Sequence, residues 1–146
     1  MTDYEHVEVL LVEDSPHDAE MTMHALSDNK FLSKVHWVKD GVQALDFIGC
    51  VGEYAQRDPS QLPKVVLLDL KMPKVDGLDV LREIKGNERW RGIPVVIMTS
   101  SNEDRDVIES YQLGTNAYVV KPVDFLSFTE AVVRLGMFWL LVNKAP

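Results

Sequence analysis

Apolar runs alternate with amphipathic stretches along the chain, and this alternation predicts an α/β fold. Several apolar runs are almost continuous Val, Leu and Ile, which is typical of parallel strands buried on both faces. Between these runs, apolar residues recur at helical spacing. We expect a doubly wound parallel sheet of five strands, at about residues 7–12, 34–39, 64–68, 94–98 and 116–120, with five helices, at about residues 16–27, 41–48, 77–85, 102–113 and 124–142.

Residues that favour turns and helix ends support this division of the chain. Ser15 and Pro16 suit the cap and first turn of a helix, and Gly114 suits a helix terminator. Residues 52–63 are rich in Gly, Pro, Gln, Asp and Ser, which predicts a loose surface loop longer than most connections. Because no linker or repeat is visible, we expect one domain over residues 1–146, with no output or DNA-binding domain.

Composition excludes several classes of function. The chain has 146 residues, 46% of them hydrophobic, which suits one globular core. Acidic residues outnumber basic ones by 23 to 15, so we expect protein partners and no nucleic-acid groove. A single cysteine, Cys50, leaves no internal disulfide, and neither a signal sequence nor a run of about 18 to 20 apolar residues is present. The expected location is the cytoplasm, with no membrane contact.

Four of the predicted strands end on reactive or polar side chains. In chain order these are Glu13 and Asp14, then Asp69, Thr99 and Lys121. The carboxyl ends of parallel strands meet at one edge of a sheet, and ligands bind there. The pattern therefore predicts one site that combines three carboxylates, a hydroxyl and an ammonium.

The charge of this site indicates metal and phosphoryl chemistry. Three carboxylates with one ammonium leave an excess of negative charge, which a divalent cation neutralises at neutral pH, and an oxygen-only site that keeps several waters suits Mg²⁺. Beside such an ion, Asp69 is a candidate nucleophile for a phosphoryl group, whose oxygens Thr99 and Lys121 would bind. The product would be an aspartyl phosphate, lost later to an in-line water.

In combination these motifs resemble the response-regulator receiver domain of bacterial two-component signalling. The family's motifs are matched by Glu13 and Asp14, Asp69 within LLDLKMPKVDG, Thr99 within IPVVIMTSS, and Lys121 before Pro122. The resemblance implies the flavodoxin-like topology of a chemotaxis regulator, with strand order 2-1-3-4-5. It also implies a phosphoprotein that accepts its phosphoryl group from a sensor histidine kinase and catalyses only its own phosphorylation and dephosphorylation.

The resemblance also assigns roles at the site. Asp14, Asp69 and the backbone carbonyl of Lys71 would bind Mg²⁺, and Glu13 would act partly through water. The peptide bond between Lys121 and Pro122 would be cis, as is far easier before a proline than elsewhere.

A switch is implied as well. Phosphorylation would draw the Thr99 hydroxyl inward, and the ring of Tyr118 would fill the space that it leaves. The surface around the fourth helix, fifth strand and fifth helix would then change, biasing an existing equilibrium between two packings. The output would be protein binding: to a downstream target, back to the kinase, or to a histidine phosphotransfer protein.

The last predicted helix carries two apolar stripes. The first should pack on the sheet, and the second lies on a face that a monomer would expose, which predicts a homodimer. The second stripe consists of Leu126, Val133, Met137 and Leu140. The ending MFWLLV, residues 137–142, resembles the standalone receivers that partner bacterial phytochromes and related histidine kinases.

Alternatives from other classes fit less well. A dehalogenase-type phosphatase needs a second acid two residues after its nucleophile, where this chain has Lys71. A nucleotide or flavin binder needs a glycine-bearing phosphate loop after the first strand, and residues 13–18, EDSPHD, contain no glycine. The remaining alternatives are a phosphorylation-independent interaction module and an intermediate in a multistep phosphorelay.

Overall fold

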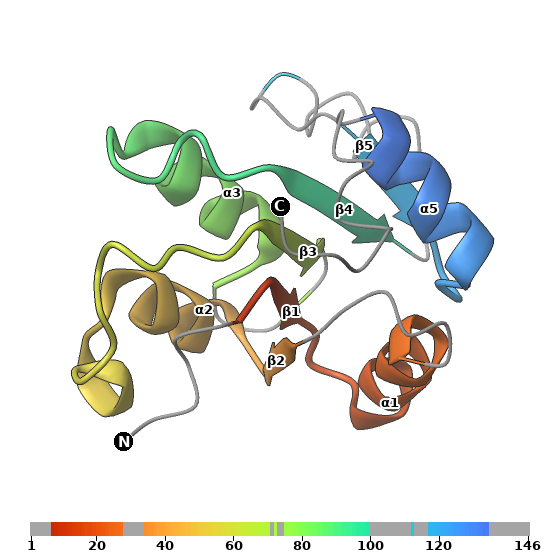
Figure 1. Ribbon diagram of the computed structural model, residues 1–146, viewed down its shortest axis with the longest axis horizontal. Helices are drawn as coiled ribbons and strands as arrows, with labels where there is room; N and C mark the ends of the chain where they lie inside the picture. The colour runs from red at the N-terminus through yellow and green to blue at the C-terminus, as the bar shows by residue number, and fades with distance from the viewer. Residues whose placement is uncertain are drawn as a thin grey trace.

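The computed structural model describes residues 7–27, 34–70, 72, 75–99, 112 and 117–134. Five strands form one parallel sheet in the order β2-β1-β3-β4-β5 (Figure 1). The strands are β1 (Val9–Val12), β2 (Val35–Val38), β3 (Val65–Asp69), β4 (Val95–Thr99) and β5 (Ala117–Val120). The predicted fold class and strand order are therefore confirmed.

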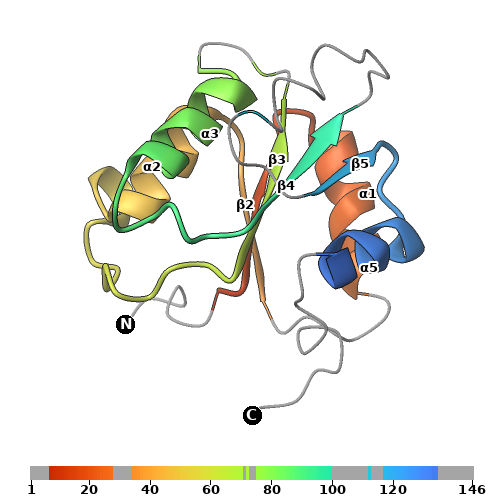
Figure 2. The same cartoon turned by 90° about the horizontal axis from the view of Figure 1, so that it is seen from above.

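Four α-helices cover the sheet within the described part of the chain. They are α1 (Pro16–Ser27), α2 (Gly41–Gly49), α3 (Gly77–Gly86) and α5 (Phe125–Arg134). Helices α2 and α3 lie against one face, and α1 and α5 lie against the other (Figure 2). The predicted helix at residues 102–113 lies outside the described residues apart from Gln112, and so does the end of the last predicted helix after residue 134. Among the described residues, no helix combines the length and apolar character needed to cross a bilayer.

The alternation of side chains along the strands divides the core into two layers. Leu10 and Val12 pack with apolar residues of α2 and α3, whereas Val9 and Leu11 pack with those of α1 and α5. Every residue of β1 and β3 is buried. This two-sided burial explains why the sequence of these strands is apolar without a break. The parallel pairing of β1 with β3, in register from Val9 with Val65 onward, places the carboxyl ends of the two strands side by side.

Short polar caps fix where the helices begin at the carboxyl edge of the sheet. Asp40 and Asp76 accept hydrogen bonds from the backbone N–H groups three residues later, at 2.8 and 3.0 Å. Gly77 follows the second of these caps, and a Cβ atom there would lie 2.2 Å from the carbonyl oxygen of Asp69. The first residue of α3 must be glycine for the helix to start this close to the end of β3.

The segment after α2 is more ordered than its composition predicts. Residues Gly52–Tyr54 form a short 3₁₀ helix, and Tyr54 and Arg57 are buried. Arg57 donates hydrogen bonds to the carbonyl oxygens of Phe47 and Gln61, and its guanidinium lies 3.9 Å from the centre of the Phe47 ring. The segment is a surface loop as expected, with most of its residues exposed, but a buried cation that bonds to backbone carbonyls ties it to the end of α2.

Candidate functional site

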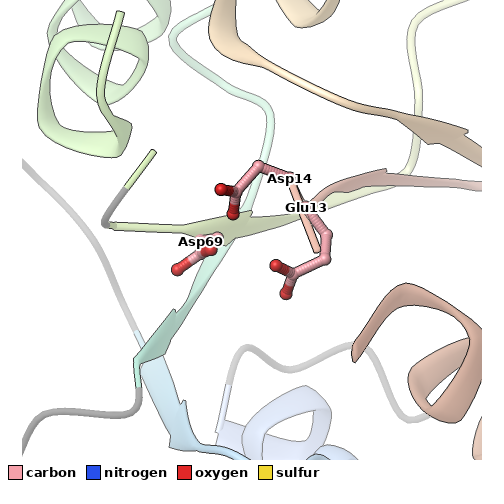
Figure 3. Close-up of side chains that lie close together, drawn as sticks. All are labelled: Glu13, Asp14 and Asp69. Carbon is pink, nitrogen blue, oxygen red and sulfur yellow. The ribbon is translucent and has the colours of Figure 1, made fainter. Parts of the chain in front are cut away.

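The acidic residues predicted to share a site do so. Glu13 and Asp14 follow β1 directly, and Asp69 is the last residue of β3. One carboxylate oxygen from each of the three lies within 4.8 Å of the others. Figure 3 shows the three side chains gathered at this edge of the sheet. Glu13 and Asp69 are buried, whereas Asp14 is exposed. The cluster therefore has one side inside the protein and one side open to water.

Three hydrogen bonds hold Glu13 in place. Its backbone N–H donates to the carbonyl of Val38 at 3.1 Å, and its carbonyl accepts from the indole Nε1–H of Trp37 at 2.8 Å. Its side-chain Oε2 accepts from the backbone N–H of Ser15 at 3.2 Å. Because Val38 and Trp37 belong to β2, the position of Glu13 depends on the edge strand as well as on β1.

Lys121 brings a positive charge to the cluster from the end of β5. Its Nζ lies 2.6 Å from Oε1 of Glu13 and 3.2 Å from Oδ2 of Asp69. The contact with Glu13 is the shortest ion pair that Lys121 makes among the described residues. The peptide bond from Lys121 to Pro122 is cis, as the resemblance to receiver domains implied.

Burial and charge shift the acid–base equilibria of the site. Burial, with the added repulsion of Glu13, raises the pKa of Asp69 from its ordinary value of 3.8 to about 7, although Lys121 opposes the change. Burial by itself would lower the pKa of Lys121, but the contacts with Glu13 and Asp69 outweigh it and raise that pKa. Asp69 therefore stays partly protonated near neutral pH unless further positive charge approaches it.

The donor set fits a hard divalent cation. It offers carboxylate oxygens only, its acids outnumber the basic groups among the described residues, and its exposed side leaves room for water ligands. Magnesium and manganese both have this preference for oxygen. Lys71, whose carbonyl was a predicted ligand, lies outside the described residues.

The remaining predicted residues are placed to different extents. Thr99 ends β4 and pairs with Val120 in β5, but its side chain is outside what the structure describes. Tyr118 is half-buried in β5, next to Ile97 of β4, and packs against the core on the α2 and α3 side. The contacts among Glu13, Asp69 and Lys121 are therefore observed in the structure, whereas the roles of Thr99 and Tyr118 stay predictions.

The second apolar stripe of the last helix is described in part. Leu126 and Val133 are exposed, at 68% and 50%, which agrees with an apolar face that does not pack on the sheet. Met137 and Leu140 lie outside the described residues. The dimer that this stripe predicts therefore stays a prediction.

Sequence reasoning missed Asp18, which belongs to the first turn of α1. Its Oδ2 lies 3.3 Å from Nζ of Lys121. A signal was available, because a helix that begins at Pro16 presents its first turn beside the carboxyl end of β1. Which side chain of that turn meets Lys121 depends on how α1 lies relative to the end of β5, and this the sequence pattern does not specify.

The comparisons with known proteins agree with the fold. Residues 9–133 match the response regulator receiver domain, and the chain belongs to this family. It is 38% identical to response regulator Rcp1 of Synechocystis sp. (strain PCC 6803) over 138 residues, which cover 94% of this chain and 92% of Rcp1. A solved structure of Rcp1 is its Mn²⁺-bound form.

Two solved bacteriophytochrome response regulators are more similar still. AtBRR is 50% identical with a TM-score of 0.85, and the match covers 94% of this chain and 98% of AtBRR. RtBRR is 48% identical with a TM-score of 0.85, and the match covers 96% of this chain and 84% of RtBRR. The resemblance seen in the sequence is therefore confirmed at the level of the family and of its phytochrome response regulators.

Proposed function

We propose that this receiver accepts a phosphoryl group on Asp69 from a sensor histidine kinase, in a Mg²⁺-dependent reaction, and signals by changing its protein contacts in the cytoplasm. Receiver domains of this family act in phosphorylation-based signalling and pair with histidine kinases. The observation that carries the proposal is the placement of Asp69, buried at a strand end between an acidic pair and an ammonium 3.2 Å away.

The transfer itself requires little chemistry from the protein beyond positioning and charge. An Oδ atom of Asp69 forms a bond to phosphorus while the bond from phosphorus to the donor histidine nitrogen breaks, and that nitrogen keeps the electron pair. Asp14, Asp69 and the Lys71 carbonyl would hold the metal, with Glu13 acting partly through water. When bound, Mg²⁺ supplies positive charge that shields the phosphoryl group from these carboxylates.

Lys121 contributes charge at a different point of the site. Its ammonium contacts Oδ2 of Asp69 before reaction, so it lies within reach of oxygens on a phosphorus bonded there. The Thr99 hydroxyl would bind a further phosphoryl oxygen, since Thr99 ends the strand next to β3. No proton transfer to Asp69 is needed, because its carboxylate is the nucleophile; its raised pKa makes the metal's neutralising charge important for ionisation.

The output would run through the β5 and α5 surface. Movement of Thr99 toward the phosphoryl group and of the Tyr118 ring into the vacated space would alter this surface. A homodimer formed through Leu126, Val133, Met137 and Leu140 would use the same region, which the exposure of Leu126 and Val133 supports. The proposed kinase partner is a bacterial phytochrome, because two of the solved relatives are bacteriophytochrome response regulators. A histidine phosphotransfer protein or a separate target protein would receive the signal.

Incubation with acetyl phosphate and Mg²⁺, followed by intact mass measurement, tests the proposal directly. We expect an adduct of one phosphoryl group that hydroxylamine removes, in the wild type and in Asp79→Asn, and none in Asp69→Asn. Asp79 is a matched control, since it is an exposed acid of α3 paired with Arg82. Absence of the adduct with both acetyl phosphate and a purified phytochrome kinase would favour a phosphorylation-independent interaction module.

A further inference from the structure

Asp18 is an anionic partner of Lys121 that none of the sequence motifs includes. Its Oδ2 lies 3.3 Å from Nζ of Lys121, on an ammonium that Glu13 and Asp69 also contact. The side chain of Asp18 is 40% exposed, compared with 13% for Lys121 and 6% for Asp69. Asp18 thus approaches the ammonium from the solvent side of the site.

The start of α1 explains why the Asp18 carboxylate is available to Lys121. Ser15 caps the helix, and its Oγ accepts a hydrogen bond from the backbone N–H of Asp18 at 3.2 Å. In a capping box, an acid at the position of Asp18 would accept a return bond from the backbone N–H of the cap residue. Here that N–H donates to Oε2 of Glu13 instead, at 3.2 Å. Glu13 replaces Asp18 in the local cap, and Asp18 pairs across the fold with Lys121.

The three partners of Lys121 differ in what the proposed reaction does to them. Asp69 becomes bonded to phosphorus, and Glu13 belongs to the acidic cluster that would bind the metal. Both carboxylates therefore change partners during the reaction. Asp18 belongs to neither set, so it can hold the ammonium throughout.

Resting on the function proposed above, we propose that Asp18 is a positioning residue that keeps the Lys121 ammonium at the solvent side of the site while Glu13 and Asp69 change partners. The ammonium then meets the oxygens of the incoming phosphoryl group without first reorienting its flexible side chain. Asp18 forms no covalent bond and moves no proton in this role.

The expected effect is modest, because the ion pair is partly exposed. Asp18→Asn should slow phosphorylation by acetyl phosphate about two- to fivefold, the range of a solvent-accessible ion pair. Asp18→Glu keeps the charge on a longer side chain and should recover most of the rate. Asp79→Asn removes a comparable acid from the first turn of α3 and should react at the wild-type rate.

A competing explanation is that Asp18 acts on α1 alone, as an acid in the first turn that interacts with the helix dipole. Two double-mutant cycles with Lys121→Gln separate the explanations. In the first, phosphorylation rates are measured, and Asp18→Asn should have no effect once Lys121 is Gln. In the second, urea unfolding is measured in EDTA without metal, and Asp18→Asn should cost stability only while Lys121 is present. An equal effect of Asp18→Asn in both backgrounds would overturn the positioning role.

The wild type shows whether a negative result concerns Asp18 or the function as a whole. If the wild type forms no adduct, the proposed function fails and the role of Asp18 in it fails too. If the wild type is phosphorylated and Asp18→Asn reacts at the same rate, only the role of Asp18 is overturned.

Discussion

The protein places a basic side chain at the amino end of its sheet and another at the carboxyl end, and the two places are built differently. Near the amino end of β3, the guanidinium of Arg57 bonds to neutral carbonyl oxygens and lies over the Phe47 ring. At the carboxyl edge, the ammonium of Lys121 contacts carboxylates of Glu13, Asp69 and Asp18. The first arrangement spreads one charge over polar acceptors, and the second gathers more negative than positive charge.

This difference separates a structural charge from a functional one. The two terminal nitrogens of Arg57 donate to carbonyl oxygens of Phe47 and Gln61, and so connect the end of α2 to the segment before β3. Among the described residues, carboxylates outnumber ammonium groups in the acidic cluster, and burial together with repulsion from Glu13 raises the pKa of Asp69. A buried charge that lacks sufficient counter-charge indicates a binding site more strongly than burial alone does.

Replacing Arg57 should have the largest effect on stability. Arg57→Leu leaves the carbonyls of Phe47 and Gln61 without their donor, which we expect to lower the free energy of unfolding by about 3 kcal/mol. Urea unfolding measures this change. Arg82→Leu, at an exposed arginine of α3, is the control and should change the free energy by less than about 0.5 kcal/mol. An Arg57→Leu protein as stable as the control would show that the buried guanidinium is not structural.

The second prediction concerns pH. The folded protein holds the Asp69 proton up to about pH 7, whereas an unfolded chain releases it near the ordinary value of 3.8. The folded state therefore binds more protons between these values, and this contribution to stability is lost as pH rises through 7. Relative to Asp69→Asn, the metal-free wild type should lose about 2 kcal/mol between pH 5 and pH 8. Parallel curves for the two proteins would mean that Asp69 is not short of counter-charge.

Mg²⁺ should stabilise the protein by binding the acidic cluster, without any effect on the contacts of Arg57. At tenfold excess over its Kd, Mg²⁺ should stabilise the wild type by about 1.4 kcal/mol at pH 8. The same stabilisation is expected in Arg57→Leu and not in Asp69→Asn, because only the latter changes the acidic cluster. Thermal unfolding with and without EDTA gives the comparison, and equal stabilisation of all three proteins would place the cation elsewhere.

The smallest predicted effect is at the hydrogen bond from β2 to the site. Trp37→Phe removes the donor to the Glu13 carbonyl and should lower stability by about 1 kcal/mol. It should also weaken Mg²⁺ binding, measured by calorimetry, because the backbone beside Glu13 is less restrained. Trp90→Phe is a matched replacement in the other core layer, away from the acidic cluster, and should leave Mg²⁺ affinity unchanged. Unchanged affinity in both variants would show that this bond does not position the site.

The fold could be predicted from the sequence because its signals are local and repeated. The unbroken apolar runs of β1 and β3 indicate burial on both faces, and that leaves few alternatives to a parallel sheet covered by helices. Residues 52–63 show the limit of composition. Their polar and turn-forming residues correctly predicted a surface loop, but not the buried Arg57, because the carbonyls that it contacts come from positions 47 and 61, on either side of it.

The site was predictable to the extent that strand ends determine it. Glu13, Asp69 and Lys121 follow apolar runs directly, so the topology alone brings them together. Asp18 is different, because the direction of its side chain depends on the cap of α1 and on the path of the chain after β5. The contact of Asp18 with Lys121 depends on how α1 lies relative to the end of β5, and the sequence pattern of either element does not specify this.

The indole of Trp37 gives the acidic cluster an optical reporter within the native sequence. Its N–H donates a hydrogen bond to the backbone carbonyl of Glu13 at 2.8 Å. A cation that binds the carboxylate of Glu13 therefore changes the electric field at the indole. In a protein that carries Trp90→Phe and Trp139→Phe, the emission of Trp37 should shift on titration with Mg²⁺. The loading of the site could then be followed in real time, without a label and before any phosphoryl group is transferred.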